Sequence, residues 1–318
     1  MNSTIARFLI FVFAALPATA QAGQTLNIAV TNDDGWKAPG IQVMHRTLKA
    51  AGHQATLVAP ADQQSGSSAS LNTGQTVLRR EAEDQFSVHA CLDQECKART
   101  GAEPASCALI AIDIAQRRSG GTPPDLLISG INDGPNLGGV TQSSGTVGAT
   151  ASALTRSMNG AVTAIAVSTS EPAGCSEEPA CIEEHYAQVS DFIVNLLALL
   201  AERRTEPGSP LLPDGMGLNI NYPPVQPTGL RVVAQDAAIL TERGPSRVNA
   251  GCSLCLDIGI GNEAPGEILG IVPDTLVSPE GEIAGFLSGQ ITIVPIRIDY
   301  TASDHAQLKG LFEGLLEP

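Results

Sequence analysis

Short apolar runs alternate with amphipathic stretches along most of the chain. LNIAVT (26–31) is an almost uninterrupted apolar run, which is typical of a strand buried on both faces. After the polar loop NDDGWKAP, apolar residues recur at the helical spacing Ile41, Met44 and Leu48, and QATLVAP (54–60) is a second strand that ends in proline. A strand, a helix and a strand over this length predict parallel pairing through a right-handed crossover.

The same alternation continues to about residue 222. Helices are predicted at 104–118, 146–158 and 186–204, and strands at 125–130, 163–168 and 215–224, with a weaker strand region at 75–90 and an irregular stretch at 91–103. This order predicts an α/β fold in which a mostly parallel sheet lies between two helical layers.

The pattern changes in the last third of the chain. Gly, Pro and polar residues dominate until a late strand at 291–300 and a final helix at 303–316. We therefore expect a catalytic α/β domain over residues 23–224. Residues 225–318 would form a C-terminal region that packs on this core or on a partner subunit.

The first 22 residues have the three regions of a secretory signal. Arg7 precedes the apolar run Phe8–Leu16, and Pro17 and small residues follow it, with possible cleavage after ATA or AQA. The run is too short to cross a bilayer. We expect a cleaved signal peptide at 1–22, a periplasmic or secreted protein, and no membrane attachment after cleavage.

Charge and composition limit the class of partner. The chain has 18 Lys and Arg against 33 Asp and Glu, a formal net charge of −15, and 3% aromatic residues. The negative charge disfavours a DNA or RNA duplex as a partner. The low aromatic content leaves few side chains on which nucleic acid bases could stack. A small phosphorylated substrate stays compatible, because one bound cation inverts the local field.

Six of the seven cysteines fall into three close pairs. In an oxidising compartment we expect the bridges Cys91–Cys96, Cys175–Cys181 and Cys252–Cys255. The CSLC of the last pair has no second CxxC or His cluster, which disfavours zinc. Cys107 lies in an apolar stretch and is predicted to be a buried free thiol.

Polar loops follow three of the predicted strands. In a parallel sheet such loops meet at the carboxyl edge, where α/β proteins bind ligands. Carboxylate, amide and hydroxyl oxygens suit a hard divalent cation better than zinc. For NDDG the alternative is an ordinary turn. The candidate side chains are Asn32, Asp33 and Asp34 in the first loop, Ser65 in the second, and Ser129, Asn132, Asp133, Asn136, Ser143, Ser144 and Thr146 in the third.

SGTVGAT (144–150) opens a predicted helix. Its free N–H groups and positive dipole would suit a phosphate, and Gly145 would let a ligand approach, although Ser144 could simply cap the helix. The chain has no Walker lysine, no GxSxG and no HExxH, so that P-loop, serine-esterase and zincin chemistries find no support.

Several of these stretches occur in a fixed order: VTNDDGWKAPGI, LVAPADQQSGSSASL, PDLLISGINDGPNLGG, SSGTVGA, TAIAVS and LNINYP. In this order they resemble the SurE family of metal-dependent nucleotidases and phosphatases, over roughly residues 26–222. The resemblance implies a Rossmann-like core with an extended C-terminal arm that is exchanged in homodimers or homotetramers.

The resemblance also implies the roles of individual residues. One divalent cation per subunit (Mg²⁺, Mn²⁺ or Ca²⁺) would be bound by Asp33, Asp34, Ser65 and Asn132. The substrate would be bound by Asn32, Asn136, Ser144, Gly145 and Thr146. Catalysis would involve Asp33, Asp34, Asn136 and Ser144. The implied reaction is hydrolysis of phosphate monoesters, in particular nucleoside 5′- and 3′-monophosphates, by metal-assisted attack of water without a covalent enzyme intermediate.

The chain departs from the family pattern after NLG. Family members commonly have acids and an aromatic residue before SGT, whereas this chain has GVTQS (139–143). The metal set is unaffected. The departure leaves an alternative function open, an exported metal- or nucleotide-binding protein with little or no turnover.

Overall fold

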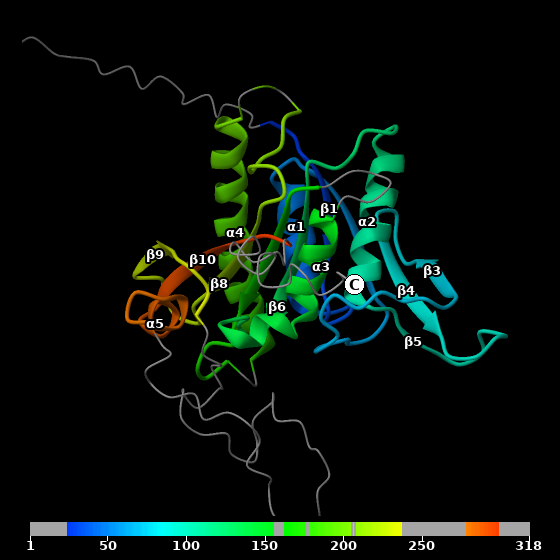
Figure 1. Ribbon diagram of the computed structural model, residues 1–318, viewed down its shortest axis with the longest axis horizontal. Coiled ribbons are helices and arrows are strands. Elements are labelled where there is room, and N and C mark those ends of the chain that lie inside the picture. Colours follow the sequence, from blue (N-terminus) through cyan, green and yellow to red (C-terminus); the bar gives the residue numbers. More distant parts are fainter. Residues whose placement is uncertain are drawn as a thin grey trace, which may run out of the picture.

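The computed structural model describes residues 24–155, 162–175, 178–204, 206, 208–236 and 278–298. Within these residues the strands form one mixed sheet of order β3-β4-β2-β1-β6-β7-β8-β10-β9, and β5 pairs with β4 (Figure 1). The strands are β1 (Asn27–Thr31), β2 (Gln54–Pro60), β3 (Thr76–Arg80), β4 (Gln85–Cys91), β5 (Arg99–Gly101), β6 (Leu126–Asp133), β7 (Ala164–Thr169), β8 (Gly217–Tyr222), β9 (Gly229–Val232) and β10 (Gln290–Ile296).

Helices cover both faces of the sheet, so the three-layer prediction is confirmed. The helices are α1 (Pro39–Ala50), α2 (Pro104–Arg118), α3 (Gly145–Leu154), α4 (Pro179–Glu202) and α5 (Glu282–Leu287), with a 3-10 turn η1 (Gly139–Gln142). Apolar residues of α1 and α4 pack on one face of the central strands, and those of α2 and α3 pack on the other.

The central strands β2, β1, β6, β7 and β8 are parallel neighbours. Their side chains are buried on both faces, which explains the continuous apolar runs Ile28–Val30 and Leu126–Ile128. Antiparallel pairs flank this parallel part, β3 and β5 against β4 at one side and β10 against β8 at the other. Figure 1 shows these two flanks at opposite ends of the molecule.

Some elements differ from the sequence-based expectation. The weak strand region 75–90 is a hairpin of two strands, and the stretch 91–103, expected to be irregular, contains β5. Helix α4 begins at Pro179, well before Tyr186. β9 and α5 lie in the tract 225–290, which shows few periods because β9 is mostly exposed and both elements are short.

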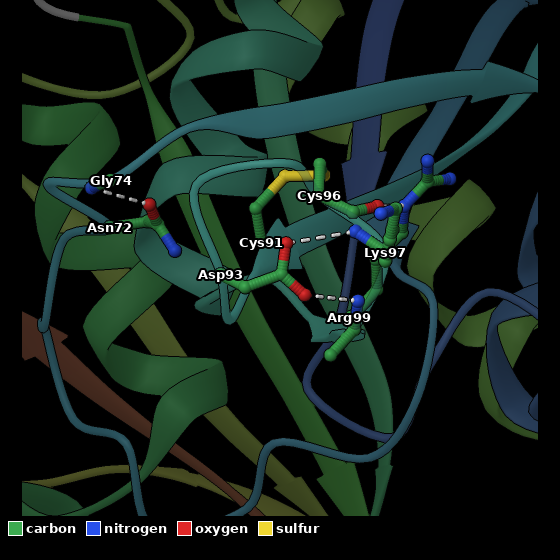
Figure 2. The surroundings of a disulfide bond; sticks show 8 residues. Asn72, Gly74, Cys91, Asp93, Cys96, Lys97 and Arg99 are labelled. Atoms are coloured by element: carbon green, nitrogen blue, oxygen red, sulfur yellow. Dashed lines mark hydrogen bonds between the residues drawn. A yellow bond between two sulfur atoms is a disulfide. The ribbon is translucent and has the colours of Figure 1, made fainter.

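Two of the three predicted bridges are present, Cys91–Cys96 and Cys175–Cys181, and Cys107 is a buried free thiol. Figure 2 shows that the Asp93 carboxylate lies inside the loop closed by the first bridge. It accepts hydrogen bonds from the N–H groups of Lys97 at 3.0 Å and Ala98 at 2.7 Å, which fixes this loop between β4 and β5.

Several predictions lie outside the described residues. They are the signal peptide at 1–22, the Cys252–Cys255 pair, most of the C-terminal arm and the final helix at 303–316. The late strand is confirmed as β10, which joins the main sheet between β8 and β9. No helix among the described residues is both long and apolar enough to cross a membrane.

Candidate metal and phosphate site

The three predicted loops meet at the carboxyl edge of the sheet. β1 pairs with β2 on one side and with β6 on the other, all parallel, so the loops that follow them are neighbours. Backbone hydrogen bonds join them: the N–H of Gln64 donates to the carbonyl of Asp33 at 2.7 Å, and the N–H of Ser68 donates to the carbonyl of Ser143 at 3.2 Å.

Asp33 is directed at the N-terminus of α3. Its carboxylate is 3% exposed and accepts a hydrogen bond from the Thr146 hydroxyl at 2.5 Å. Burial raises the pKa of Asp33, while hydrogen bonds from Thr146 and from backbone N–H groups including that of Gly145 oppose this rise. Gly145 is required here, since an added Cβ would lie 2.8 Å from Asp33 Oδ2. The first acid and the start of α3 therefore share one small volume.

Asp34 is half-buried beside it. Its Oδ2 accepts a hydrogen bond from the N–H of Asp133 at 3.2 Å, and the Gln63 side chain also hydrogen-bonds it. Burial raises the pKa of Asp34 to about 7, and the charges of Asp33 and Asp133 add to the effect. No ion pair among the described residues involves Asp33 or Asp34. Within the described part of the chain, no side-chain cation compensates the repulsion between these two adjacent carboxylates.

Four further side-chain oxygens near these loops are buried and lack a hydrogen-bond partner within the described structure: Thr31 Oγ1, Asn32 Oδ1, Ser67 Oγ and Ser129 Oγ. Asn32 uses its Nδ2 to bind the carbonyl of Gly35 at 3.0 Å, which leaves its oxygen free. Ser67 lies beside the start of α3, because a Cβ on Gly145 would approach its Oγ to 3.0 Å. Buried oxygens without partners are costly. A bound cation would satisfy any of them, whereas an anion could accept hydrogen bonds only from the serine hydroxyls.

Of the other two predicted metal ligands, Asn132 is buried and Ser65 is exposed. Asn132 is buried at the end of β6, and its Nδ2 donates to the carbonyl of Gly134 at 2.6 Å, which leaves its Oδ1 as an available ligand. The backbone N–H of the next residue, Asp133, donates a hydrogen bond to the Asp34 carboxylate. Ser65 occupies an exposed turn one residue after Gln64, which itself binds the Asp33 backbone.

The hydrogen bonds of Asn136 and Ser144 hold the loop that leads into α3. The Asn136 side chain donates to Ser168 Oγ at 2.8 Å, and its backbone is bound by the side chains of Asn219 and Asn221 on β8. Ser144 caps α3 by accepting a hydrogen bond from the N–H of Val147 at 3.1 Å. The capping alternative is therefore realised, and the N–H groups of α3 still face Asp33.

Comparison with known proteins decides the family. Residues 28–243 match the family described as "Survival protein SurE". The chain belongs to the SurE family. A protein of Desulfitobacterium hafniense (strain DSM 10664 / DCB-2), named "5'-nucleotidase SurE", is 30% identical over 293 residues, which cover 91% of this chain and 97% of that protein. A protein of the same name from Cereibacter sphaeroides is 32% identical over 299 residues, 90% of this chain and 99% of its own length.

A solved structure supports the fold. The crystal structure of the SurE protein from Aquifex aeolicus superimposes with a TM-score of 0.64 and covers 90% of this chain and 99% of its own. Its sequence identity is 21%, so this likeness shows the fold alone.

The donor set of this SurE protein fits a hard divalent cation. Among the described residues no group of three or more His, Cys, Asp or Glu side chains is arranged to hold a metal, so a ligand set here must use amide and hydroxyl oxygens besides the two acids. The carboxylates of Asp33 and Asp34, which have no ion-pair partner among the described residues, and the oxygens Asn32 Oδ1 and Ser67 Oγ provide such a set. Ser65 stays the predicted ligand of the SGSS motif, and Ser67 Oγ is a second hydroxyl of the same motif that lies near the acids without a hydrogen-bond partner in the described structure.

Proposed function

We propose that this SurE protein is a metal-dependent phosphomonoesterase that hydrolyses nucleoside 5′-monophosphates, and also 3′-monophosphates and related esters. One observation carries the proposal: the acid Asp33 lies against the N-terminus of α3. A helix N-terminus attracts phosphate and a pair of acids attracts a divalent cation. The relatives named 5'-nucleotidase SurE support the choice of substrate.

The residues that would hold the cation are Asp33, Asp34, Ser65 and Asn132, one cation for each subunit, with Mg²⁺, Mn²⁺ or Ca²⁺ as the candidates. A bound cation of this kind supplies charge neutralisation at the phosphate oxygens and lowers the pKa of water. It also offsets the repulsion between the adjacent acids.

The chain's own groups would bind the phosphate and hold the water. The N–H groups of Gly145 and Thr146 hydrogen-bond the Asp33 carboxylate in the absence of a cation. Once a cation holds that acid, these groups, with Ser144 and Asn136, would stabilise charge on the phosphate oxygens. Asn32 would orient the first acid by fixing the loop through Gly35. Asp34 is the more exposed of the two acids, so we assign it, rather than Asp33, to orient the attacking water.

We further propose that the protein is exported and works as a homodimer or homotetramer. The N-terminal pattern and the two bridges in the described part of the chain support export. The net charge of −15 favours a small phosphate ester over a nucleic acid duplex as the substrate.

The test is turnover by the purified mature protein. Hydrolysis of AMP and of p-nitrophenyl phosphate should require Mn²⁺ or Mg²⁺ and stop on addition of EDTA. Asp33→Asn should lower kcat/KM by several orders of magnitude, whereas Asp191→Asn, an exposed acid on α4, should leave it unchanged. Metal and nucleotide binding without turnover would favour the alternative, a binding protein, which the GVTQS departure at 139–143 motivates.

A further inference from the structure

The backbone of Gly138 is held by side chains from the C-terminal part of the chain. Glu282, the first residue of α5, accepts a hydrogen bond from the N–H of Gly138 at 2.6 Å. Gln235 donates from its Nε2 to the carbonyl of Gly138 at 2.7 Å. The N–H of Gly138 is thus bound by a residue 144 positions away, and its carbonyl by Gln235, 97 positions away, and also by the N–H of Thr141 at 3.2 Å.

These contacts belong to a buried polar group, here called the polar clasp, formed by Gln235, Asp236, Gly281 and Glu282. Glu282 is 0% exposed, and its Oε1 also accepts a hydrogen bond from the N–H of Asp236 at 3.1 Å. Asp236 in turn accepts from the N–H groups of Ser278 at 3.2 Å and Ile283 at 2.9 Å. A side chain at position 281 would meet Asp236 Oδ1 at 2.3 Å, so the clasp requires a glycine there.

A carboxylate at this position is energetically costly. Burial raises the pKa of Glu282 to about 7, the nearby Asp236 adds to the rise, and Glu282 Oε2 has no partner within the described structure. An apolar residue would avoid this cost but would leave the N–H of Gly138 without an acceptor. The arrangement is explained if the position of Gly138 matters.

Gly138 lies inside the loop that leads to the proposed phosphate site. Two residues earlier, Asn136 is fixed by Asn219 and Asn221 of β8. After Gly138, the turn η1 runs directly into Ser144, the cap of α3. The polar clasp therefore holds the middle of a loop whose start is fixed by β8 and whose end presents the N-terminus of α3.

We propose that Glu282 is a positioning residue, which fixes Gly138 and through it the phosphate-binding end of α3. This inference rests on the proposed function and assigns to the C-terminal region a part in the site. Glu282 does not touch the substrate; it acts as a hydrogen-bond acceptor for the loop. Displacing a binding group by about 1 Å costs up to roughly 100-fold in rate, which sets the size of the expected effect.

The experiment compares four variants of the full mature chain. Glu282→Ala removes the acceptor, and Glu282→Gln keeps an oxygen that can accept the same N–H groups. Gln235→Ala removes the long-range donor to the Gly138 carbonyl at a half-buried position and leaves the Glu282 acceptor in place. Glu280→Gln is the matched control, an exposed acid two residues before Glu282.

Each variant is measured for kcat and KM with p-nitrophenyl phosphate, for the inhibition constant of inorganic phosphate, and for Mn²⁺ affinity by calorimetry. We expect Glu282→Ala to lower kcat/KM about 10- to 100-fold and to raise the phosphate inhibition constant by a similar factor. Gln235→Ala should lower kcat/KM about 3- to 10-fold and raise the phosphate inhibition constant by a similar factor. Glu282→Gln and Glu280→Gln should stay within about 3-fold, and Mn²⁺ affinity should change little, because the clasp does not hold the acids.

The outcomes separate the two proposals. If the unmodified protein has no turnover, the proposed function fails. If it turns over and both Glu282→Ala and Gln235→Ala keep normal kcat/KM and phosphate inhibition, even with a lower melting temperature, the clasp is merely structural and the inference is overturned. If a folded Glu282→Gln loses as much activity as Glu282→Ala, the negative charge itself is needed and the acceptor role is wrong.

Discussion

Replacing Asp34 by asparagine is expected to make the metal-free protein more stable and the enzyme inactive. In the absence of metal, Asp34 is half-buried next to Asp33 and Asp133, and its pKa is raised from 3.8 to about 7. Asparagine has the same shape and can still accept the hydrogen bond from the N–H of Asp133. The change therefore removes charge while keeping the contact.

The size and sign of the effect follow from the pKa. A carboxyl with a higher pKa in the folded than in the unfolded chain binds more protons when folded, so the free energy of unfolding falls as pH rises between the two values. The rise from 3.8 to about 7 corresponds to at most about 4 kcal/mol, lost in full above about pH 7. Without that charge the Asp34→Asn variant should not suffer this loss.

The assay is urea unfolding in EDTA at pH 4, 5.5 and 8, with the unmodified protein and Asp191→Asn as references. The stability difference between Asp34→Asn and the unmodified protein should be small at pH 4 and should grow to about 2–4 kcal/mol at pH 8 in favour of the variant. In a parallel series without EDTA, added Mn²⁺ should stabilise the unmodified protein and hardly affect the variant, because a ligand that binds the folded state alone shifts unfolding by mass action.

The opposite result has a clear meaning. If Asp34→Asn is no more stable at pH 8 than at pH 4 relative to the unmodified protein, then burial and the neighbouring acids do not raise the pKa of Asp34. If Mn²⁺ stabilises both proteins equally, Asp34 is not a metal ligand, and NDDG is better explained as a turn.

Three further expectations concern other parts of the molecule. Gly145→Ala places a methyl group 2.8 Å from an Asp33 oxygen, so kcat/KM should fall about 100-fold with a stability loss of about 1–3 kcal/mol; an active variant in a steady-state assay would contradict the close approach of α3. Replacing both residues of the Cys91–Cys96 bridge by serine should cost about 2 kcal/mol in urea unfolding and leave kcat unchanged; peptide mapping that finds these two thiols free in the secreted protein would remove the basis for this. Export predicts a mature N-terminus at Gln21 or Gly23 by Edman sequencing, and an intact Met1 in a cytoplasmic fraction would refute it.

Most of the central fold could be predicted from the sequence, because buried parallel strands and the helices between them have strong periods. The strand at 54–60 and the helix at 104–118 have the predicted bounds. The start of α4 was missed because the residues before Tyr186 are rich in acids and small residues and carry little apolar signal. The hairpin β3–β4 was missed as two strands because β3 is an exposed edge with no alternating face.

Some residues around the candidate site could also be predicted from the sequence, and others could not. Asp33 and the segment 144–146 could be placed together from sequence, because parallel strands bring their following loops to one edge. Glu282 could not be found, since it lies in an aperiodic tract and its partner is a backbone N–H rather than a recognisable side chain. The buried hydroxyl of Ser67 could not be predicted either, because the burial of each serine in SGSS depends on where the turn directs it.

The contact between Asp33 and Thr146 joins residues 113 positions apart, and β1 reaches its neighbour β6 across a similar length of chain. During synthesis the two acids therefore leave the ribosome long before the helix that faces them. Long-range parallel pairing of this kind forms slowly, since a large loop must close before its contacts are gained. Before β6 and α3 dock, we expect Asp33 and Asp34 to lie in a solvated loop. Their mutual repulsion becomes costly only when docking buries them. Assembly of the site is in this sense a late event, and a chain shortened before α3 would carry both acids without the helix that faces them.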